Sequence, residues 1–379
     1  MFILVRRLQR LSRIIFLMAV TNTENIITVL WEKGLPFAAW RFPGQDGFKL
    51  IVQLSHQLKT FDIKALEKIS GFVIAPFEST GTRQIYVLEP DLVFDEWPDL
   101  QTIKELPDFR SPGQTVPENV FWNRQTYMKK AEQLIKDLKT GKLKKVVLSR
   151  VIEKKLRKDF DPGASFELLN ERYAHSFNYV FNIPELGSWL GASPEMLLKK
   201  EGDFIETMSL AGTKPARDIH WRPKEMEEQA IVTEFIRQQL KELQITDYKT
   251  EGPETLLAGN VGHLATKFRI PAGVLKGRLG ELTARLHPTP AVCGMPKDKA
   301  YQYILHTEDH RRKFYTGFLG PWNLEGPSAL FVNLRCAEFS SEVVHLYVGG
   351  GLTSSSVAEA EWEETEHKSK TLLSVLENF

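Results

Sequence analysis

Residues 329–351, ALFVNLRCAEFSSEVVHLYVGGG, contain two apolar segments in close succession. Ala329–Ala337 and Val343–Gly349 are rich in branched and aromatic side chains, so both indicate β-strands. The same composition predicts further strands at Val146–Leu148, Tyr179–Ile183, Trp189–Leu190 and Phe204–Met208. Periodic apolar positions predict helices at Asn119–Lys139, Pro223–Leu243, Pro296–His306 and Glu359–Leu376. Strands that arrive in runs predict the α+β class with mainly antiparallel sheets, rather than a doubly wound fold.

The composition excludes several classes of protein. The chain has 379 residues, of which 49 are basic and 48 acidic, so its formal net charge of +1 creates no field that would attract nucleic acid. Its two cysteines, Cys293 and Cys336, are too few for a disulfide framework and lack the paired spacing of a zinc site. We therefore predict a cytoplasmic protein with no nucleic-acid partner.

Prolines and glycines divide the chain into two portions. They interrupt any regular pattern over residues 98–117, so we separate an N-terminal portion, residues 21–118, from a denser region, residues 119–379. Residues 1–20 combine several arginines with the apolar run Ile14–Val20, which is shorter than the roughly 20 residues of a membrane span. We interpret them as a leader, with a signal peptide or a surface helix as alternatives, and predict no stable membrane span.

Two charged residues adjoin apolar segments. Lys145 opens the strand Val146–Leu148, where a lysine usually extends into water; a buried amine with a lowered pKa would instead act as a base. Glu195 follows Trp189–Leu190, where it is either solvated in a turn or buried as a catalytic acid. Leu210–Thr213 offers backbone amides beside a hydroxyl, as anion-binding loops do, although an ordinary turn has the same composition.

The last predicted helix carries Glu361, Glu364 and Lys368 on one face, at spacings of three and four. Two carboxylates that can reach a hard cation suit a metal-bound carboxylate substrate, although a solvated Glu/Lys face has the same spacing. Just upstream, the glycines 349–351 would let a ligand approach the backbone closely. Arg335 stands in an apolar strand and needs an anionic partner, either a substrate carboxylate or an internal salt bridge.

The order of these motifs carries more information than any one of them. They follow one another as KVVLSR (145–150), GASPE (191–195), LAGT (210–213), Lys224 with Glu228, HLAT (263–266), HPTPA (287–291), residues 308–317, LRCA (334–337), GGG (349–351), and EWEET (361–365) with Lys368. This series resembles the chorismate-binding enzymes: isochorismate synthases, salicylate synthases, and the synthase components of anthranilate and aminodeoxychorismate production. The resemblance covers about residues 119–379.

The resemblance implies a fold and a set of ligands. The family fold, as in anthranilate synthase component I, is a single large domain of two face-packed antiparallel β-sheets with surrounding helices, and it binds chorismate with Mg²⁺ in a central cleft. The positions that match the family's Mg²⁺ ligands are Glu228 and Glu364, with Glu361 nearby through water. The positions that match its substrate-binding residues are Ala211, Gly212, Thr213, His263, Ala291, Tyr315, Arg335, Gly349, Gly350, Gly351 and Lys368.

The resemblance also implies a reaction. Isochorismate synthesis adds water at C2 of the ring while the C4 hydroxyl departs. Lys145 matches the lysine that activates the water, and Glu195 matches the acid that protonates the leaving hydroxyl. Ammonia-using relatives usually carry glutamine at the first position and threonine where Ala291 stands, so we expect an isochorismate synthase of menaquinone or siderophore biosynthesis.

Three alternatives stay open: a salicylate synthase, an anthranilate or aminodeoxychorismate synthase component, and a non-catalytic chorismate-binding relative. We expect a monomer without an obligatory amidotransferase partner. The chain departs from the family's common sequence at several positions, for example at Gln229, where histidine is frequent. None of these departures removes a proposed catalytic group.

Overall fold

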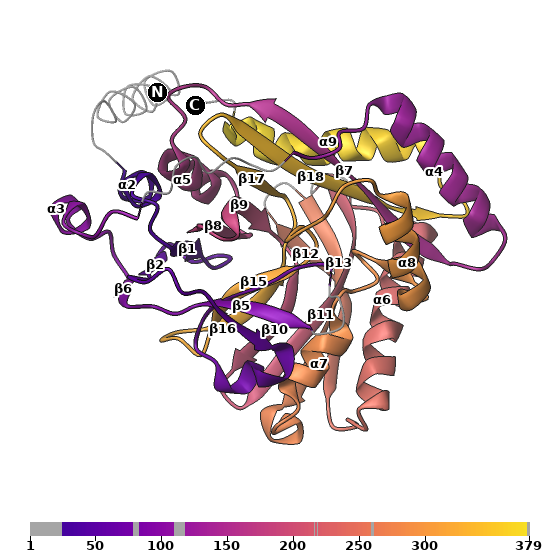
Figure 1. Cartoon of the computed structure of the whole chain (residues 1–379). Helices are drawn as coiled ribbons and strands as arrows, with labels where there is room; N and C mark the ends of the chain where they lie inside the picture. The colour runs from indigo at the N-terminus through magenta and orange to yellow at the C-terminus, as the bar shows by residue number, and fades with distance from the viewer. Residues whose placement is uncertain are drawn as a thin grey trace, which may run out of the picture.

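The predicted strands pair into two antiparallel β-sheets that lie face to face, with the helices outside them (Figure 1). The predicted α+β architecture is therefore confirmed. The computed structural model describes residues 25–78, 83–109, 118–215, 217, 219–258 and 261–376. The predicted leader, residues 1–20, lies outside the described residues.

The first sheet joins segments that are far apart in the sequence. Its nine strands in spatial order are β14 (Gly294–Met295), β7 (Lys145–Lys155), β18 (Val343–Thr353), β17 (Cys336–Phe339), β9 (Gly187–Ser193), β8 (Phe177–Ile183), β1 (Phe37–Arg41), β2 (Lys49–Val52) and β6 (Leu92–Phe94). All neighbours in it are antiparallel. β18 pairs with β7 over its whole length, from Val343 opposite Lys155 to Thr353 opposite Lys145.

The second sheet has the same number of strands. Its spatial order is β12 (Lys249–Ala258), β13 (Val261–Pro271), β11 (Phe204–Pro215), β10 (Met196–Glu201), β16 (Ser328–Val332), β15 (Phe318–Trp322), β4 (Gly71–Ala75), β5 (Gln84–Leu88) and β3 (Lys59–Asp62). Its pairings are also antiparallel. The N-terminal portion of the chain therefore supplies strands to both sheets.

Aromatic side chains fill the space between the sheets. Phe177 of the first sheet stacks on Phe331 of the second, with ring centroids 4.2 Å apart. Successive residues of β1 point in opposite directions, as the pleat requires. Trp40 enters the core between the sheets, whereas Phe37 and Ala39 enter the core under the helices. Because aromatic rings bury large apolar areas, the layer between the sheets is a main source of stability.

The helices cover the outer faces of the two sheets. The first sheet is covered by α2 (Ile26–Glu32), α3 (Leu100–Lys104), α5 (Pro162–Arg172) and α9 (Ala358–Leu376), with α4 (Arg124–Lys139) and α8 (Lys297–Thr307) beside β7. The second sheet is covered by α6 (Pro223–Glu242), α7 (Leu279–Leu286) and the short 3₁₀ helices Ile63–Lys68 and Ala272–Leu275. The predicted helix over Asn119–Lys139 begins later than expected, after Asn123, because the Asn123 side chain accepts the Thr126 N–H and caps the helix.

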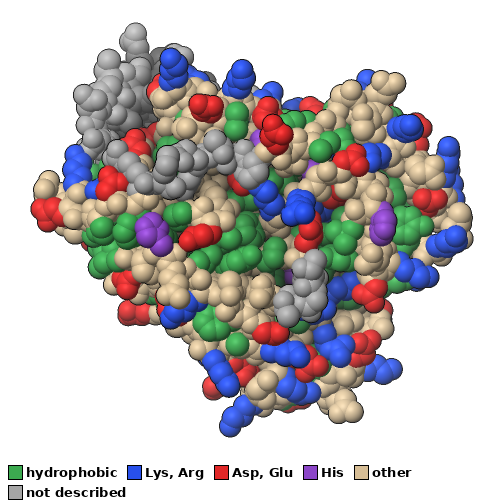
Figure 2. Space-filling view, in the orientation of Figure 1, with side chains coloured by type: hydrophobic (Ala, Val, Ile, Leu, Met, Phe, Trp, Pro, Cys, Tyr) green, Lys and Arg blue, Asp and Glu red, His purple; other side chains and the backbone are tan. Residues whose placement is uncertain are grey.

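The surface mixes both signs of charge. On the face shown in Figure 2, Lys and Arg side chains alternate with Asp and Glu, and neither sign gathers into a large patch. This agrees with the near-zero net charge. In the part of the chain that the structure describes, no helix is both long and apolar enough to cross a membrane.

One predicted strand is wrong. The sequence indicates a single strand over Ala329–Ala337, but β16 ends at Val332 in the second sheet and β17 begins at Cys336 in the first. Between them the chain crosses from one sheet to the other, and Arg335 adopts a left-handed φ of 47°. The apolar pattern continues through the crossing because both of its ends are buried. A pattern of burial alone therefore cannot distinguish this crossing from a continuous strand.

A second crossing lies beside the first. Pro194 and Glu195 connect β9 of the first sheet to β10 of the second. The backbones of the two crossings are hydrogen-bonded, because Val332 N donates to Glu195 O (2.9 Å) and Ala192 N donates to Arg335 O (3.1 Å). Two charged residues that are distant in the sequence are therefore brought together where the chain changes sheets.

Candidate active site

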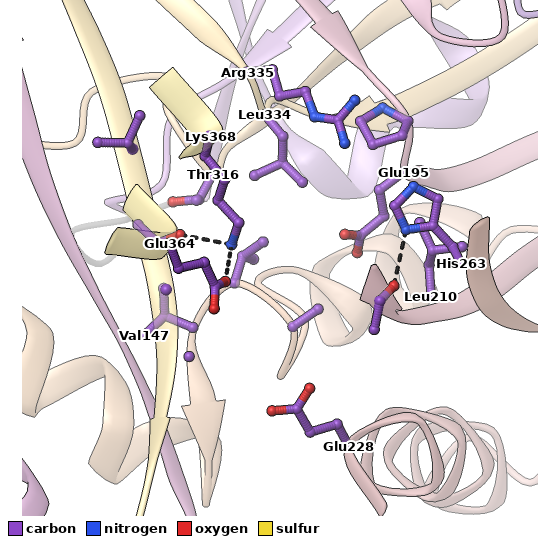
Figure 3. A pocket seen from close by; sticks show the side chains of 18 of the residues that line it. Val147, Glu195, Leu210, Glu228, His263, Thr316, Leu334, Arg335, Glu364 and Lys368 are labelled. Carbon is purple, nitrogen blue, oxygen red and sulfur yellow. Dashed lines mark hydrogen bonds and ion pairs between the residues drawn. The ribbon is translucent and has the colours of Figure 1, made fainter. Parts of the chain in front are cut away.

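A cavity of about 600 Å³, enough for a small-molecule ligand, opens beside the two crossings. Both sheets and two helices contribute to its wall, through Lys145 of β7, Glu195 of the second crossing, His263 of β13, Glu228 of α6 and Lys368 of α9. Figure 3 shows Glu195, Glu228 and Lys368, which come from separate elements, around a common space. The structure thus brings the two predicted catalytic residues into one cavity.

Lys145 is a buried lysine, 5% exposed, at the first position of β7. In the first sheet its backbone lies between two neighbouring strands, opposite Met295 of β14 and Thr353 of β18. Burial lowers the pKa of its amine, although the negative charge of Glu228 opposes this shift. A lysine with a lowered pKa has a larger neutral fraction and can accept a proton.

Glu195 is a buried carboxyl group, 4% exposed. Burial raises its pKa to about 7, while a hydrogen bond from Thr289 and the positive charge of Lys145 oppose the rise. Thr289 Oγ1 donates that bond to Glu195 Oε1 over 3.3 Å. Near neutral pH a large fraction of the carboxyl therefore keeps its proton and can act as an acid.

Arg335, for which the sequence predicts an anionic partner, lines the cavity. Among the residues that the structure describes, it has no ion-pair partner, and burial lowers the pKa of its guanidinium. An internal salt bridge is one of the two explanations that the sequence offers for this arginine, and the described residues do not provide one. Arg335 is half-buried, and withdrawing a guanidinium from water without an anion is costly, so the carboxylate ligand expected from the sequence stays a prediction for this position.

Of the three glutamates predicted to hold Mg²⁺, Glu228 and Glu364 line the cavity, whereas Glu361 is not among its lining residues. Glu361 and Glu364 stand on one face of α9 beside Gly350, whose added Cβ atom would lie 3.0 Å from Glu361 Oε2 and 3.8 Å from Glu364 Oε1. Glu228 lines the cavity from α6, as Glu364 does from α9 (Figure 3). Within the described ranges, no three His, Cys, Asp or Glu side chains form a group that could hold a metal ion.

The donor chemistry nevertheless fits Mg²⁺. This ion usually takes one or two protein carboxylates and completes its octahedral shell with water and substrate oxygens. Lys368 Nζ pairs with Glu364 Oε1 (2.7 Å) and donates to Gly349 O (2.9 Å). Both charged side chains of this pair are more than a third exposed, so the ion pair is weak and can open when a ligand arrives.

Gln229, where the family often has histidine, fixes the helix that carries Glu228. It is buried and donates to Ser209 Oγ (3.0 Å) and to Thr266 Oγ1 (2.6 Å). These hydroxyls belong to β11 and β13 of the second sheet. Gln229 therefore has a structural role that holds α6 against the sheet.

The three glycines of β18 make room for side chains of the site. A Cβ atom on Gly349 would approach Tyr315 Oη to 2.9 Å, and one on Gly351 would approach Lys145 Cε to 2.6 Å. Gly350 stands against Glu361 in the same way. The glycines thus allow protein side chains to come close. All three also line the cavity, so the ligand contact expected from the sequence stays a prediction.

The other predicted binding residues surround the same space. Those whose side chains the structure describes all line the cavity: Gly212, His263, Ala291 and Tyr315. His263 Nδ1 lies 3.0 Å from Gly212 O, and burial lowers the pKa of the ring to about 4, so the ring is neutral at neutral pH. The side chains of Ala211 and Thr213 lie outside what the structure describes, and their predicted roles stay predictions.

Sequence reasoning missed several polar residues that line the cavity or contact its lining residues. Thr289 contacts Glu195 across a separation of 94 residues, which no local pattern can signal. Arg222 and Glu225 line the cavity at the start of α6, where Arg222 N donates to Glu225 Oε2 (2.9 Å). A proline followed two residues later by glutamate is typical of a helix start, so this signal could have located the helix start, although not its position on the cavity.

This fold and site define the class of protein. The family described as chorismate-binding enzymes matches residues 89–377, and the chain belongs to that family. It is 31% identical over 247 residues to the isochorismate synthase EntC of Escherichia coli strain K12, which covers 62% of this chain and 63% of the relative. It is 29% identical over 291 residues to the isochorismate synthase MenF of the same strain, covering 73% of this chain and 66% of the relative. The chain thus matches less than two thirds of the length of these curated relatives.

Solved structures show the same fold. The DhbC protein of Bacillus anthracis superimposes with a TM-score of 0.73 at 25% identity, over 93% of this chain and 99% of that chain. The menaquinone-specific isochorismate synthase MenF of Escherichia coli superimposes with a TM-score of 0.74 at 21% identity, over 93% of this chain and 91% of that one. Anthranilate synthase component I of Streptococcus pneumoniae shares the fold at a TM-score of 0.62 and 18% identity, over 89% and 90% of the two chains.

Proposed function

We propose that the protein is an isochorismate synthase, an isomerase that converts chorismate to isochorismate. The observation that carries this proposal is that burial shifts the pKa values of two groups on one cavity in opposite directions. The amine of Lys145 is driven toward its neutral form and the carboxyl of Glu195 toward its protonated form. One base and one acid in these states are what the exchange of a hydroxyl group requires.

Each group has one proton to move. Neutral Lys145 accepts a proton from the water that adds at C2 of the ring, and protonated Glu195 donates its proton to the hydroxyl that leaves C4 as water. One water enters and one leaves, so the reaction needs no oxidant and no second substrate. Lys145 must then lose its proton and Glu195 must regain one before the next turnover.

The charged residues around this pair account for the anionic substrate. Glu228 and Glu364 would hold Mg²⁺, with Glu361 nearby, and the bound ion would neutralise the ring carboxylate of chorismate. Arg335 would hold the second carboxylate through its fork of donors. Lys368 would assist when its pairing with Glu364 opens.

The resemblance favours water over ammonia as the nucleophile, because Lys145 and Ala291 stand where ammonia-using relatives usually carry glutamine and threonine. The names of the relatives support this choice, since EntC, DhbC and MenF are isochorismate synthases. The same choice of nucleophile leaves no need for an amidotransferase partner. We also propose that the enzyme is a cytoplasmic monomer and that it serves menaquinone or siderophore biosynthesis. Salicylate synthase is the second candidate, because the same residues would serve it.

Product analysis tests the proposal. Purified protein with chorismate and Mg²⁺ should form isochorismate, which chromatography resolves from chorismate, and excess EDTA should abolish the product until Mg²⁺ is restored. Fluorescent salicylate would identify the second candidate instead. Anthranilate formed from added ammonia, or no product with Mg²⁺ present, would contradict the proposal.

Gly351→Ala should disable the proposed base without removing it. The new methyl group would lie 2.6 Å from Lys145 Cε, well inside van der Waals contact, so the amine must move. We expect kcat to fall roughly 10²-fold, because small displacements of reacting groups are costly. Gly273→Ala is the matched control, because nothing lies within 4 Å of the position of its Cβ atom. Equal kcat values for the two variants would show that Lys145 is not constrained in this way.

A further inference from the structure

β7, the strand that begins with Lys145, has a full neighbour on one side only. β18 accompanies it to Lys155, but on the other side β14 pairs only with Lys145 and Val146, and Cys293 O accepts the Val147 N–H (2.8 Å). The next backbone groups on that side are Val147 O and Ser149 N. They are buried inside the protein and need partners.

Two side chains take the place of the missing strand. Arg312 Nη2 donates to Val147 O (2.9 Å), and Glu308 Oε1 accepts from Ser149 N (2.7 Å). The two side chains also form a bidentate ion pair, with Nη2 to Oε1 at 2.6 Å and Nε to Oε2 at 2.7 Å. The donor and the acceptor are therefore held at a fixed separation, as they would be in a β-strand.

The same guanidinium reaches two other parts of the cavity wall. Arg312 Nη1 donates to Val292 O (2.9 Å) and to Thr316 Oγ1 (3.2 Å). Val292 and Thr316 both line the cavity, next in sequence to Ala291 and Tyr315. One side chain thus connects the strand of the proposed base to two segments that face the substrate.

Because the Glu308–Arg312 ion pair is buried, we infer that it fixes the positions of its neighbours more than it stabilises the fold. The Arg312 side chain is 1% exposed and that of Glu308 is 2% exposed. Desolvating two charges offsets most of their attraction, so a well-packed apolar pair would stabilise the fold as well. An apolar pair could not hydrogen-bond three separate segments at fixed distances.

The neighbouring Ser149 and His310 do not make this cluster a second catalytic site. His310 Nε2 lies 2.9 Å from Ser149 Oγ, and Glu308 Oε2 approaches the same ring nitrogen at 3.5 Å. In a nucleophilic triad the carboxylate binds the other ring nitrogen and orients the histidine. The cluster is also buried away from the cavity lining.

We propose that Glu308 and Arg312 are positioning residues, which replace a strand along β7 and set the distance between Lys145 and the wall formed by Ala291, Tyr315 and Thr316. The proposal rests on the proposed function for its effect on turnover. Its structural half, that the pair restrains β7, does not depend on that function.

Arg312→Lys is the first test. Lysine keeps the charge opposite Glu308, but its one nitrogen cannot occupy the positions of the three guanidinium nitrogens that reach Val147 O, Val292 O and Glu308. We expect kcat for isochorismate formation to fall at least roughly tenfold, with KM for chorismate within about threefold of wild type. Amide hydrogen exchange over β7 should accelerate by about tenfold or more.

Two further variants separate positioning from stability. Arg278→Lys is the matched control, because Arg278 also bridges two backbone carbonyls, of Leu243 (2.8 Å) and Val274 (3.2 Å), and does not line the cavity. It should lower Tm without changing kcat. Glu308→Gln/Arg312→Met removes the donor to Val147 O and Val292 O but leaves no unpaired buried charge, so it should fold with a lower Tm and still show the lowered kcat.

Either of two results would overturn the inference. One is a kcat within threefold of wild type in both Arg312 variants, and the other is unchanged exchange over β7 in Arg312→Lys. If the wild-type protein makes no isochorismate, the proposed function fails by itself. The exchange comparison between Arg312→Lys and Arg278→Lys then still decides whether the pair restrains β7.

Discussion

Replacing Lys145 by alanine should reduce kcat for isochorismate formation by roughly 10³-fold or more, because the variant has no group that can take a proton from the attacking water. The substrate carboxylates would still meet Arg335 and the proposed Mg²⁺ site. We therefore expect KM for chorismate to change much less than kcat. Steady-state kinetics with chromatographic detection of isochorismate measure both quantities.

Loss of folding should not contribute to this effect. The amine of Lys145 is buried, and burial disfavours its charged form, so its removal relieves a desolvation cost. Tm should stay near the wild-type value or rise. Lys144→Ala is the matched control, because Lys144 is exposed and only its backbone N–H is held, by Met295 O (2.7 Å). A Lys145→Ala enzyme with more than a tenth of wild-type kcat would eliminate the assigned base.

Glu195→Gln should be comparably damaging. The amide has nearly the shape of the carboxyl and can still accept the Thr289 hydrogen bond, but it has no proton to give to the leaving hydroxyl. We expect kcat to fall roughly 10³-fold. Glu201→Gln, at the end of β10 and exposed, is the control for a carboxylate lost from the same strand. Retained turnover in Glu195→Gln would require another acid.

The pH dependence of kcat and of the stability of the wild-type enzyme provides a second test of the protonation state of Glu195. Glu195 is active when protonated, so its contribution to kcat should be complete well below its pKa of about 7 and lost as the pH rises through that value. The free energy of unfolding should also fall as the pH rises. Between the ordinary value of 4.5 and about 7, the folded state keeps a proton that the unfolded state has released, so rising pH destabilises the fold. Glu195→Gln should lack this decline.

The sequence contained enough information for the architecture and for most charged residues of the cavity. Runs of apolar strands indicated the α+β class, and the order of short motifs indicated the family. Lys145 and Glu195 each adjoin an apolar segment, which leaves a solvated side chain as an alternative, and only the resemblance to the family implies their catalytic roles. Their environments were not predictable, since the space that the Lys145 side chain occupies lies beside Gly351, a residue of a different strand.

The features that sequence reasoning missed are tertiary. The break at Asn333–Arg335 is stabilised by contacts from elsewhere, because the Asn333 side chain donates to Phe314 O (3.0 Å) and accepts from Tyr179 Oη (2.6 Å). Glu308 and Arg312 have the spacing of an ordinary helical salt bridge, and that spacing does not indicate their bonds to a distant strand. Contacts of this kind can be found only once the strands are placed.

The strand order has a consequence for biosynthesis. β17 and β18 lie between β7 and β9 in the first sheet, and β15 and β16 lie between β4 and β10 in the second, yet all four are among the last strands translated. A nascent chain therefore carries two half-built sheets whose open edges can pair with other polypeptides. Until these strands have been synthesised, we expect the nascent chain to be prone to aggregation through the open edges of its sheets.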